Sequence, residues 1–525
     1  MIDKSNSRTT NTLYNFISSI GGQLLAIIMQ FVIRTVFIAT LGKSYLGING
    51  LFANILSVLS LAEFGVGSAI LFKLYDPIAK QDHHRITVLM KFYKSVYRFI
   101  GIGVAAIGLC LIPFLPNLIS DYSKLQELHI NAPLIFCLFL FKSVSSYLFF
   151  AYRSAIIQAN QKEYYINIIS YFFTIGAGIV QIICLLLFRD FILYVLISIL
   201  QVVGQNLACA VLAGKLYPYI NDKTEDKIEK KEIKGIVKDC GALFLYKLNG
   251  VVLKATDNIV ISMFVGLETV GEYSNYYIFY TTINSLFANV YNSVSHSLGN
   301  LHTGNDRKHE YKIFEASILI TAILGGTAFI GIFVCADELV KSWIGSDWVL
   351  NQPFAFLMGL EIYTLAFRIA LSKYRTTMGL FQQAKWRPLF GMIINLVVSV
   401  ALVRIWGICG VLVGTIVADW TTMMWYDPII IHKYGFEGEK SVLVYYKKFV
   451  QYFVTIIILG FVDYFICSNV FLGYGWLSFF IHAIICGISI PTVLIIVSSK
   501  TDEGHYVLKL INSYIKKIKR NFKAK

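Results

Sequence analysis

The stretch that decides the fold is KDCGALFLYKLNGVVLKATDNIVISMFVGLETVGEYSNYY, which runs from residue 238 to residue 277. It is apolar enough to cross a bilayer. Polar or charged side chains nevertheless interrupt it at Lys247, Lys254, Asp257 and Asn258. At the helical period of about 100° per residue, Lys247, Lys254 and Asn258 fall on one stripe. Because an ionisable group in contact with lipid is costly, this stripe is expected to face protein or water and to mark the path of a polar or charged substrate.

The composition of the whole chain indicates a membrane protein. Of its 525 residues, 56% are hydrophobic and only 15% are charged, and the mean hydropathy is +0.64, which is far too apolar for a soluble globular chain. About 14 apolar runs are each long enough to span roughly 30 Å of hydrocarbon. The sequence therefore predicts an all-α integral membrane protein with about 14 transmembrane helices. The predicted spans include 132–160, 353–379, 389–405 and 408–431.

The distribution of charge predicts the topology rather than a nucleic-acid partner. The formal net charge is +15, but the basic residues lie in short loops between the apolar runs and not on one soluble face. Counted from a cytoplasmic N-terminus, about 33 Lys and Arg residues fall inside and about 5 outside, in line with the positive-inside rule. Both termini are then cytoplasmic, and no removable signal peptide is expected. The basic stretch 73–98 is interpreted as a cytoplasmic loop with an interfacial helix.

Two sequence matches at nearly the same spacing indicate an internal repeat. The Leu-Gly pairs around Gly42 match the Val-Gly pairs around Gly266, an offset of about 224 residues. A Tyr-Arg-Ser run at Arg153 matches a Tyr-Arg-Thr run at Arg375, an offset of about 222 residues. Six helices per copy is an even number, so two parallel six-helix lobes are expected around a central cavity, with two peripheral helices after them. The predicted domains are an N-terminal lobe with its linker at 1–238, a C-terminal lobe at 239–448, and the peripheral helices with a basic tail at 449–525.

Cations outnumber acids at membrane depth, which favours an anionic substrate. Arginine can hold the oxygens of a diphosphate bidentately, while lysine supplies a point charge. Two other interpretations stay open: cations near helix ends can extend to the lipid headgroups, and deeper ones can form structural ion pairs. The residues predicted to line the substrate cavity are Arg34, Lys142, Arg153, Lys247, Lys254, Asn258, Arg368 and Arg375.

Three acids predicted to lie at membrane depth are candidates for coupling transport to an ion: Glu63, Asp257 and Glu361. A carboxylate in a low-dielectric site readily takes up a proton and can carry it across the membrane. The same acids are equally compatible with sodium coordination or with a plain packing role. Transport driven by the membrane potential also stays open. The cysteines are scattered without paired spacing, and no phosphate-binding loop, nucleophile elbow or zinc motif is present. We therefore expect no enzyme activity, no metal and no cofactor.

Three stretches carry a resemblance to a known family. LAEFGVGSAI around Glu63, KATDNIVISMFVGLETVGEYSNYY around Asp257 and YRTTMGLFQQAKWRP around Arg375 are similar to bacterial Wzx-type polysaccharide transporters, the repeat-unit flippases of the MOP exporter superfamily. The resemblance implies a multi-pass protein of the bacterial plasma membrane. Its substrate would be an undecaprenyl-diphosphate-linked oligosaccharide, moved to the outer leaflet for capsule, exopolysaccharide or other surface polysaccharide. Membrane lipids, a polysaccharide polymerase and glycosyltransferases are the implied partners.

Two alternatives to the flippase stay open. The first is a cation-coupled multidrug exporter of the same superfamily, whose cavity should favour acids and aromatic side chains that hold organic cations. The second, less favoured, is an integral-membrane glycosyltransferase or polymerase. The excess of lysine and arginine at membrane depth argues against the exporter, and short outer loops argue against the enzyme.

Overall fold

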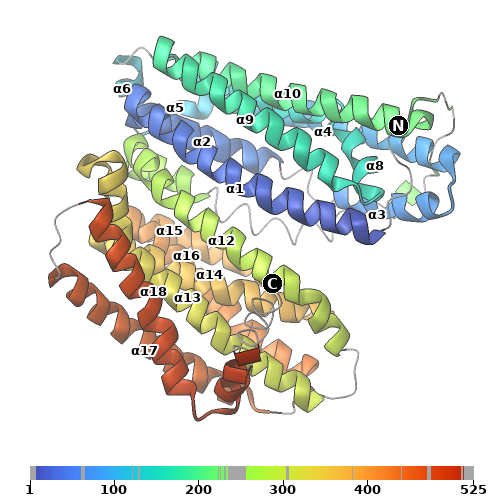
Figure 1. Ribbon diagram of the computed structural model, residues 1–525. Helices are drawn as coiled ribbons and strands as arrows, with labels where there is room; N and C mark the ends of the chain where they lie inside the picture. The colour runs from blue at the N-terminus through green and yellow to red at the C-terminus, as the bar shows by residue number, and fades with distance from the viewer. Residues whose placement is uncertain are drawn as a thin grey trace, which may run out of the picture. The chain divides into compact units, whose positions relative to one another are not determined.

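The computed structural model describes residues 8–60, 66–120, 122–127, 130–222, 224, 226, 228–229, 232–233, 256–302, 307–380, 382–438, 440–469, 475–509 and 512–513. Within these ranges the chain consists of helices and their connections, without a strand. It divides into two compact units, Met1–Gly271 (unit 1) and Glu272–Lys525 (unit 2). The colours of Figure 1 run from blue to green in unit 1 and from yellow-green to red in unit 2.

Unit 1 is a bundle of helices joined by short connections. Its main helices are α1 (Arg8–Leu41), α2 (Lys43–Leu59), α3 (Val66–Ala79), α4 (His83–Leu111), α5 (Leu115–Leu118), α7 (Ala132–Leu148), α8 (Ser154–Ala159), α9 (Glu163–Phe188) and α10 (Phe191–Leu216). The helix α9 packs between α1 and α10, and α4 packs on α7. Aromatic rings help to hold the bundle together, since Phe37 of α1 meets Phe191 and Tyr194 of α10 edge-on, with ring centroids 5.7 and 5.0 Å apart.

Unit 2 is built around one long helix. Its helices are α12 (Leu267–His302, which begins at the end of unit 1), α13 (Arg307–Ile344), α14 (Gln352–Thr377), α15 (Arg387–Trp406), α16 (Ile408–Ile430), α17 (Val442–Asn469) and α18 (Trp476–Ser498). The central helix is α13, which packs against α14, α17 and α18. Phe314 and Phe329 of α13 and Phe367 of α14 are almost inaccessible to solvent. This apolar core fixes the helices that carry the charged side chains of unit 2.

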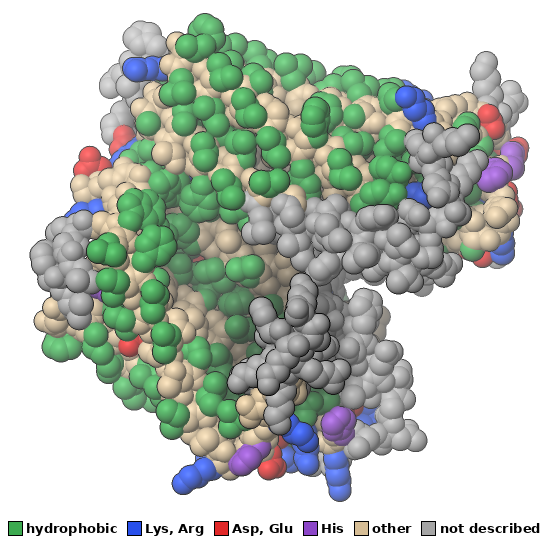
Figure 2. Space-filling view, in the orientation of Figure 1, with side chains coloured by type: hydrophobic (Ala, Val, Ile, Leu, Met, Phe, Trp, Pro, Cys, Tyr) green, Lys and Arg blue, Asp and Glu red, His purple; other side chains and the backbone are tan. Residues whose placement is uncertain are grey.

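The helices of both units are suited to a bilayer. Among the described residues, nine helices are long and apolar enough to cross a membrane, or ten if the bent pair α7 and α8 is counted as one span. Hydrophobic side chains spread over the long flanks of the helices, while charged side chains gather at the ends (Figure 2). The predicted fold class, an all-α integral membrane protein that crosses the bilayer many times, is confirmed. The count of about 14 helices and the domain boundaries stay predictions, because several ranges, including 234–255, lie outside the described residues.

Two predicted elements differ from the structure. The helix expected to lie at the interface within 73–98 is continuous with the following span, because α4 runs from His83 to Leu111. Its start is fixed by Asp82, whose carboxylate accepts a hydrogen bond from the backbone N–H of Arg85 at 2.9 Å. The span expected over 132–160 is bent instead by 41° between α7 and α8. Phe150 adopts a left-handed φ of +58° at this bend.

The glycines of the predicted repeat occupy equivalent places in the chain. Gly42 separates α1 from α2 with φ of +80°, and Gly266 stands directly before α12 with φ of +138°. Any other residue would be strained at either position, because side chains disfavour positive φ. The matched Leu-Gly and Val-Gly pairs therefore mark the same structural event, a sharp break between two helices.

The second glycine of each match allows close packing within unit 1. A Cβ atom on Gly47 of α2 would lie 2.1 Å from the carbonyl oxygen of Leu267, and one on Gly271 would lie 2.8 Å from the carbonyl oxygen of Lys43. Both contacts are to backbone, which cannot swing aside as a flexible side chain can. The start of α12 and the start of α2 thus approach each other through glycine on both sides.

Replacing Gly47 by alanine is expected to lower the thermal unfolding midpoint of the purified protein by several degrees. The added methyl group would overlap the backbone at Leu267, and overpacking of this kind costs about 1–3 kcal/mol. Gly50→Ala is the matched control, because it lies on the same helix and its Cβ would make only an ordinary contact, 3.5 Å from Cγ1 of Val270. Equal midpoints for the two variants would contradict the close approach at Gly47.

Candidate functional site

A charged cluster joins three helices of unit 2. Nη1 of Arg368 on α14 donates to Oδ2 of Asp419 on α16 at 2.9 Å, and Nη2 donates to the hydroxyl of Tyr280 on α12 at 2.8 Å. Glu361, two turns earlier on α14, is buried and interacts electrostatically with Arg368. One cation therefore faces two carboxylates, so the charge of Arg368 is already balanced within the cluster.

A second contact keeps this part of α14 and α16 in register. Nε1 of Trp420 donates to Oγ1 of Thr364 at 2.9 Å. Thr364 lies one turn before Arg368 and is fully buried, and Trp420 directly follows Asp419. Thr364 and Arg368 thus lie on the face of α14 that contacts α16, and the hydrogen bond of the indole fixes the position along the helices at which the carboxylate contacts the guanidinium.

Arg375 is held in a separate buried group. Its side chain is 1% exposed, and its Nε lies 3.6 Å from Oδ2 of Asp427. The same oxygen accepts a hydrogen bond from Nη1 of Arg387 at 2.9 Å. Asp427 itself is inaccessible to solvent. This arrangement corresponds to the structural ion pair considered for the deeper cations and not to an arginine that extends to the headgroups.

Two intramembrane cations of unit 1 have different surroundings. Arg34 on α1 lies beside the phenol of Tyr194 on α10 and interacts with it electrostatically. Lys142 on α7 is half-buried, and within the described part of the chain it makes no ion pair or hydrogen bond. An amine at this depth is costly without a partner, so among the described residues Lys142 has hydrogen-bond donors available to an added anion.

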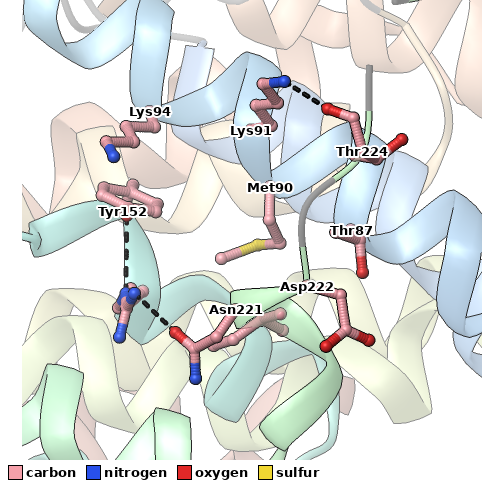
Figure 3. Close-up of a pocket in the computed structure, with 10 residues that line it drawn as sticks. Thr87, Met90, Lys91, Lys94, Tyr152, Asn221, Asp222 and Thr224 are labelled. Atoms are coloured by element: carbon pink, nitrogen blue, oxygen red, sulfur yellow. Dashed lines mark hydrogen bonds between the residues drawn. The ribbon is translucent and has the colours of Figure 1, made fainter. Parts of the chain in front are cut away.

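Arg153 lines a pocket at one end of unit 1 (Figure 3). The pocket has a volume of about 440 Å³ and lies between α4, the short turn η3 (Ala151–Arg153) and the residues after α10 that begin with η4 (Pro218–Asn221). Nη2 of Arg153 donates to Oδ1 of Asn221 at 2.8 Å. Two longer hydrogen bonds, of 3.4 and 3.5 Å, run to the hydroxyl of Tyr152 and the carbonyl of Ala210. The guanidinium is therefore anchored by neutral groups.

The remaining walls of the pocket come mainly from α4. Lys91 donates to the carbonyl of Thr224, while Lys94 and Tyr152 lie close to each other at one edge and Asp222 lies at the opposite edge (Figure 3). Thr87, which also lines the pocket, donates to the carbonyl of Tyr219 at 3.0 Å. Burial raises the pKa of the Tyr219 phenol, so it adds no negative charge near the pocket at neutral pH.

Two other predicted site residues, Asp257 and Asn258, lie in the helix at 256–264. Asp257 and Asn258 are both buried, each 4% exposed. The helix packs on the end of α5, because Oγ of Ser262 donates to the carbonyl of Leu118 at 2.8 Å. Glu63, Lys247 and Lys254 lie outside the residues whose side chains the structure describes.

Comparison with known proteins assigns the family. Residues 12–295, more than half of the chain, match a family described as "Polysaccharide biosynthesis protein". The chain belongs to this polysaccharide biosynthesis protein family. No curated protein matches the chain by sequence.

Solved structures of transporters have a fold similar to that of this polysaccharide biosynthesis protein. The lipid II flippase MurJ, in an inward closed conformation, superposes with a TM-score of 0.63 at 15% identity, over 91% of this chain and 98% of that one. An inward-facing multidrug resistance MATE transporter of the MOP superfamily gives 0.55 at 13%, over 84% and 98%. A mutant of the MATE transporter VcmN of Vibrio cholerae gives 0.52 at 13%, over 82% and 99%. The predicted resemblance is confirmed at the level of family and fold.

Several residues that organise the charged groups of this polysaccharide biosynthesis protein were not predicted as site residues. Tyr280, Asp427 and Asn221 each bind a predicted arginine. Asp427 had a sequence signal, since an acid followed by proline at the end of an apolar run is unusual in a membrane helix. A tyrosine within an apolar helix carries no such mark. In the part of the chain that the structure describes, no group of three or more His, Cys, Asp or Glu residues could hold a metal ion.

Proposed function

We propose that this protein is a flippase that moves undecaprenyl-diphosphate-linked oligosaccharide across the bacterial plasma membrane by alternating access, with both termini in the cytoplasm. The observation that carries the proposal is membership of the polysaccharide biosynthesis protein family. The fold shared with a lipid II flippase over 91% of the chain supports it. Membrane lipids surround the protein, and the polymerase and glycosyltransferases of the same polysaccharide are its proposed partners.

Lys142 is the residue of unit 1 that we assign to the diphosphate. Its amine has no charged or hydrogen-bonded partner among the described residues, and a phosphate would supply one. Arg34, which aligns with Asn258 in the predicted repeat, is the second candidate. Lys247 and Lys254 stay candidates on the sequence alone.

The cluster around Arg368 is better suited to coupling than to holding a diphosphate. The cluster brings the two carboxylates of Asp419 and Glu361 to one guanidinium. A buried carboxylate can take up a proton or bind a sodium ion. We therefore assign ion coupling to Glu361 with Asp419, and keep Asp257 as a further candidate. The competing hypothesis is that the membrane potential alone drives transport.

One observation favours a second candidate function, cation-coupled export of drugs. The same excess of acid at Arg368 would suit an organic cation, and the MATE transporter of the MOP superfamily shares the fold over 84% of this chain. The family match to polysaccharide biosynthesis supports the flippase over the exporter.

Reconstitution in liposomes tests the proposed function. Purified protein is expected to expose the sugar of an undecaprenyl-diphosphate-linked oligosaccharide on the opposite leaflet, as followed by a sugar-cleaving enzyme added outside. Lys142→Met is expected to slow this step by roughly tenfold or more, because it removes a hydrogen bond to a charged group. Since methionine places no polar group in the membrane, the variant should accumulate normally.

The controls separate the competing functions. Lys162→Met, which alters a lysine at the start of α9, should leave the rate unchanged. Ionophores that collapse a proton or a sodium gradient identify the coupling ion. Uptake of an organic cation with no movement of the sugar would favour the exporter, and elongation of the sugar chain by the purified protein would favour a polymerase.

A further inference from the structure

The pocket at the end of unit 1 carries an excess of positive charge. Among the described residues, three cations line it, from Lys91, Lys94 and Arg153, against one carboxylate, from Asp222, which gives a net charge of +2. A phosphate monoester carries about −1.5 to −2 at neutral pH. The charge of the pocket therefore matches one phosphate dianion or part of a diphosphate.

The cations of the pocket have hydrogen-bond donors to spare. Arg153 has five N–H donors, of which three are used within the protein, two of them at 3.4 Å or longer. Lys91 uses one donor on the carbonyl of Thr224. Lys94 makes no hydrogen bond or ion pair among the described residues. A phosphate offers several acceptor oxygens that could use these donors, whereas a carboxylate offers only two oxygens.

The repeat provides an internal comparison for Arg153. Its counterpart Arg375 is fully buried, and its Nε lies 3.6 Å from the carboxylate of Asp427, which also binds Arg387. Arg153 is anchored instead by the amide of Asn221, which orients the guanidinium without neutralising it. The same Tyr-Arg motif therefore places its arginine beside a neutral amide in unit 1 and beside a carboxylate in unit 2.

We propose that this pocket binds the phosphate group of a phosphorylated ligand, either the headgroup of an anionic lipid or a soluble phosphate compound. Its volume of about 440 Å³ lies within the usual range of about 300–1,000 Å³ for small-molecule sites. The positive-inside rule predicts that this end of unit 1 faces the cytoplasm, where both sources are present. The inference concerns unit 1 alone and does not depend on which solute the protein transports.

A bound phosphate would also connect elements that are separate in the sequence. Arg153 belongs to the short turn at the 41° bend between α7 and α8, whereas Lys91 and Lys94 belong to α4. A phosphate held by both would tie the bend to α4. Occupancy of the pocket is thus expected to raise the stability of unit 1 as well as to neutralise its charge.

Binding is tested with the full-length protein in phosphatidylcholine nanodiscs. In one arm, inorganic pyrophosphate is titrated by calorimetry. In the other, the nanodiscs contain a minor fraction of phosphatidic acid, and the lipid retained by the protein is counted by native mass spectrometry. Lys94→Ala is expected to weaken binding by roughly tenfold to a hundredfold, the loss typical of a hydrogen bond between charged groups. Lys215→Ala, an exposed lysine at the end of α10, is the matched control and should bind as the wild type.

Two more variants distinguish a loss of binding from a folding defect. Arg153→Lys keeps the charge but loses the planar fork, and is expected to weaken binding by several-fold. Asp222→Asn removes the carboxylate that lines the pocket and should strengthen binding, an outcome that misfolding cannot produce. A response in the pyrophosphate arm identifies a soluble ligand, and a response in the phosphatidic acid arm identifies a lipid headgroup. If Lys94→Ala and Lys215→Ala behave alike in both arms, or if the wild type binds neither probe, the proposal is wrong.

Discussion

Alanine in place of Asp427 is expected to leave little folded protein in the membrane. The carboxylate is inaccessible to solvent and stands between two arginines, 2.9 Å from Nη1 of Arg387 and 3.6 Å from Nε of Arg375. Its removal would take away the carboxylate that lies against both arginines. Breaking a buried pair in this way costs about 3–5 kcal/mol, a large share of the roughly 5–15 kcal/mol that stabilises a typical protein. The yield of monodisperse protein in detergent and its thermal unfolding midpoint measure the effect.

An exposed aspartate provides the control for this substitution. Asp76 forms an ion pair with Lys80 at 2.9 Å, but both side chains are about 70% exposed. Surface pairs of this kind contribute about 0–1 kcal/mol, so Asp76→Ala should accumulate and unfold as the wild type does. An Asp427→Ala protein with the same yield and midpoint as Asp76→Ala would contradict the structural role of the buried group.

Long apolar runs with clear ends were predictable from the sequence. The predicted spans 353–379, 389–405 and 408–431 correspond to α14, α15 and α16. The turn between the last two contains Gly407 with φ of +56°, a position where glycine is the least strained choice. The bend at Phe150 has no such signal, because neither proline nor glycine marks it. A helix break that is caused by packing alone therefore cannot be predicted from sequence patterns.

Partners of the charged residues could not be predicted, because they come from distant parts of the chain. The helical period of about 100° per residue puts Glu361 and Arg368, seven residues apart, on one face of α14, and the structure brings them together. It could not show that Asp419, about fifty residues later, closes the group. Likewise the motifs at Arg153 and Arg375 have similar sequences, although Arg153 binds an amide and Arg375 lies beside a carboxylate. Sequence spacing therefore predicts how deep in the membrane a charged residue lies, but not which residue binds it.

Glutamine in place of Arg368 is expected to slow transport in liposomes by roughly tenfold or more and to lower the thermal midpoint. The substitution removes a charge-assisted hydrogen bond to Asp419 and a hydrogen bond to Tyr280. Asp419 and Glu361 would then lose the guanidinium that they share, which favours uptake of a proton by one of them. Tyr280→Phe is the control, since it removes only the hydroxyl and should slow transport by only a few-fold.

A double substitution distinguishes charge balance from a direct part in transport. In Arg368→Gln/Asp419→Asn the guanidinium and its main carboxylate are both replaced by neutral amides, which can still hydrogen-bond to each other. The thermal midpoint is therefore expected to recover toward that of the wild type. Transport is expected to stay slow, because the coupling that we assign to this cluster needs a carboxylate beside a cation. The carboxylate must change its position when its charge changes. Recovery of both midpoint and transport in the double variant would mean that Arg368 and Asp419 only compensate each other, and coupling would then have to be sought at Asp257.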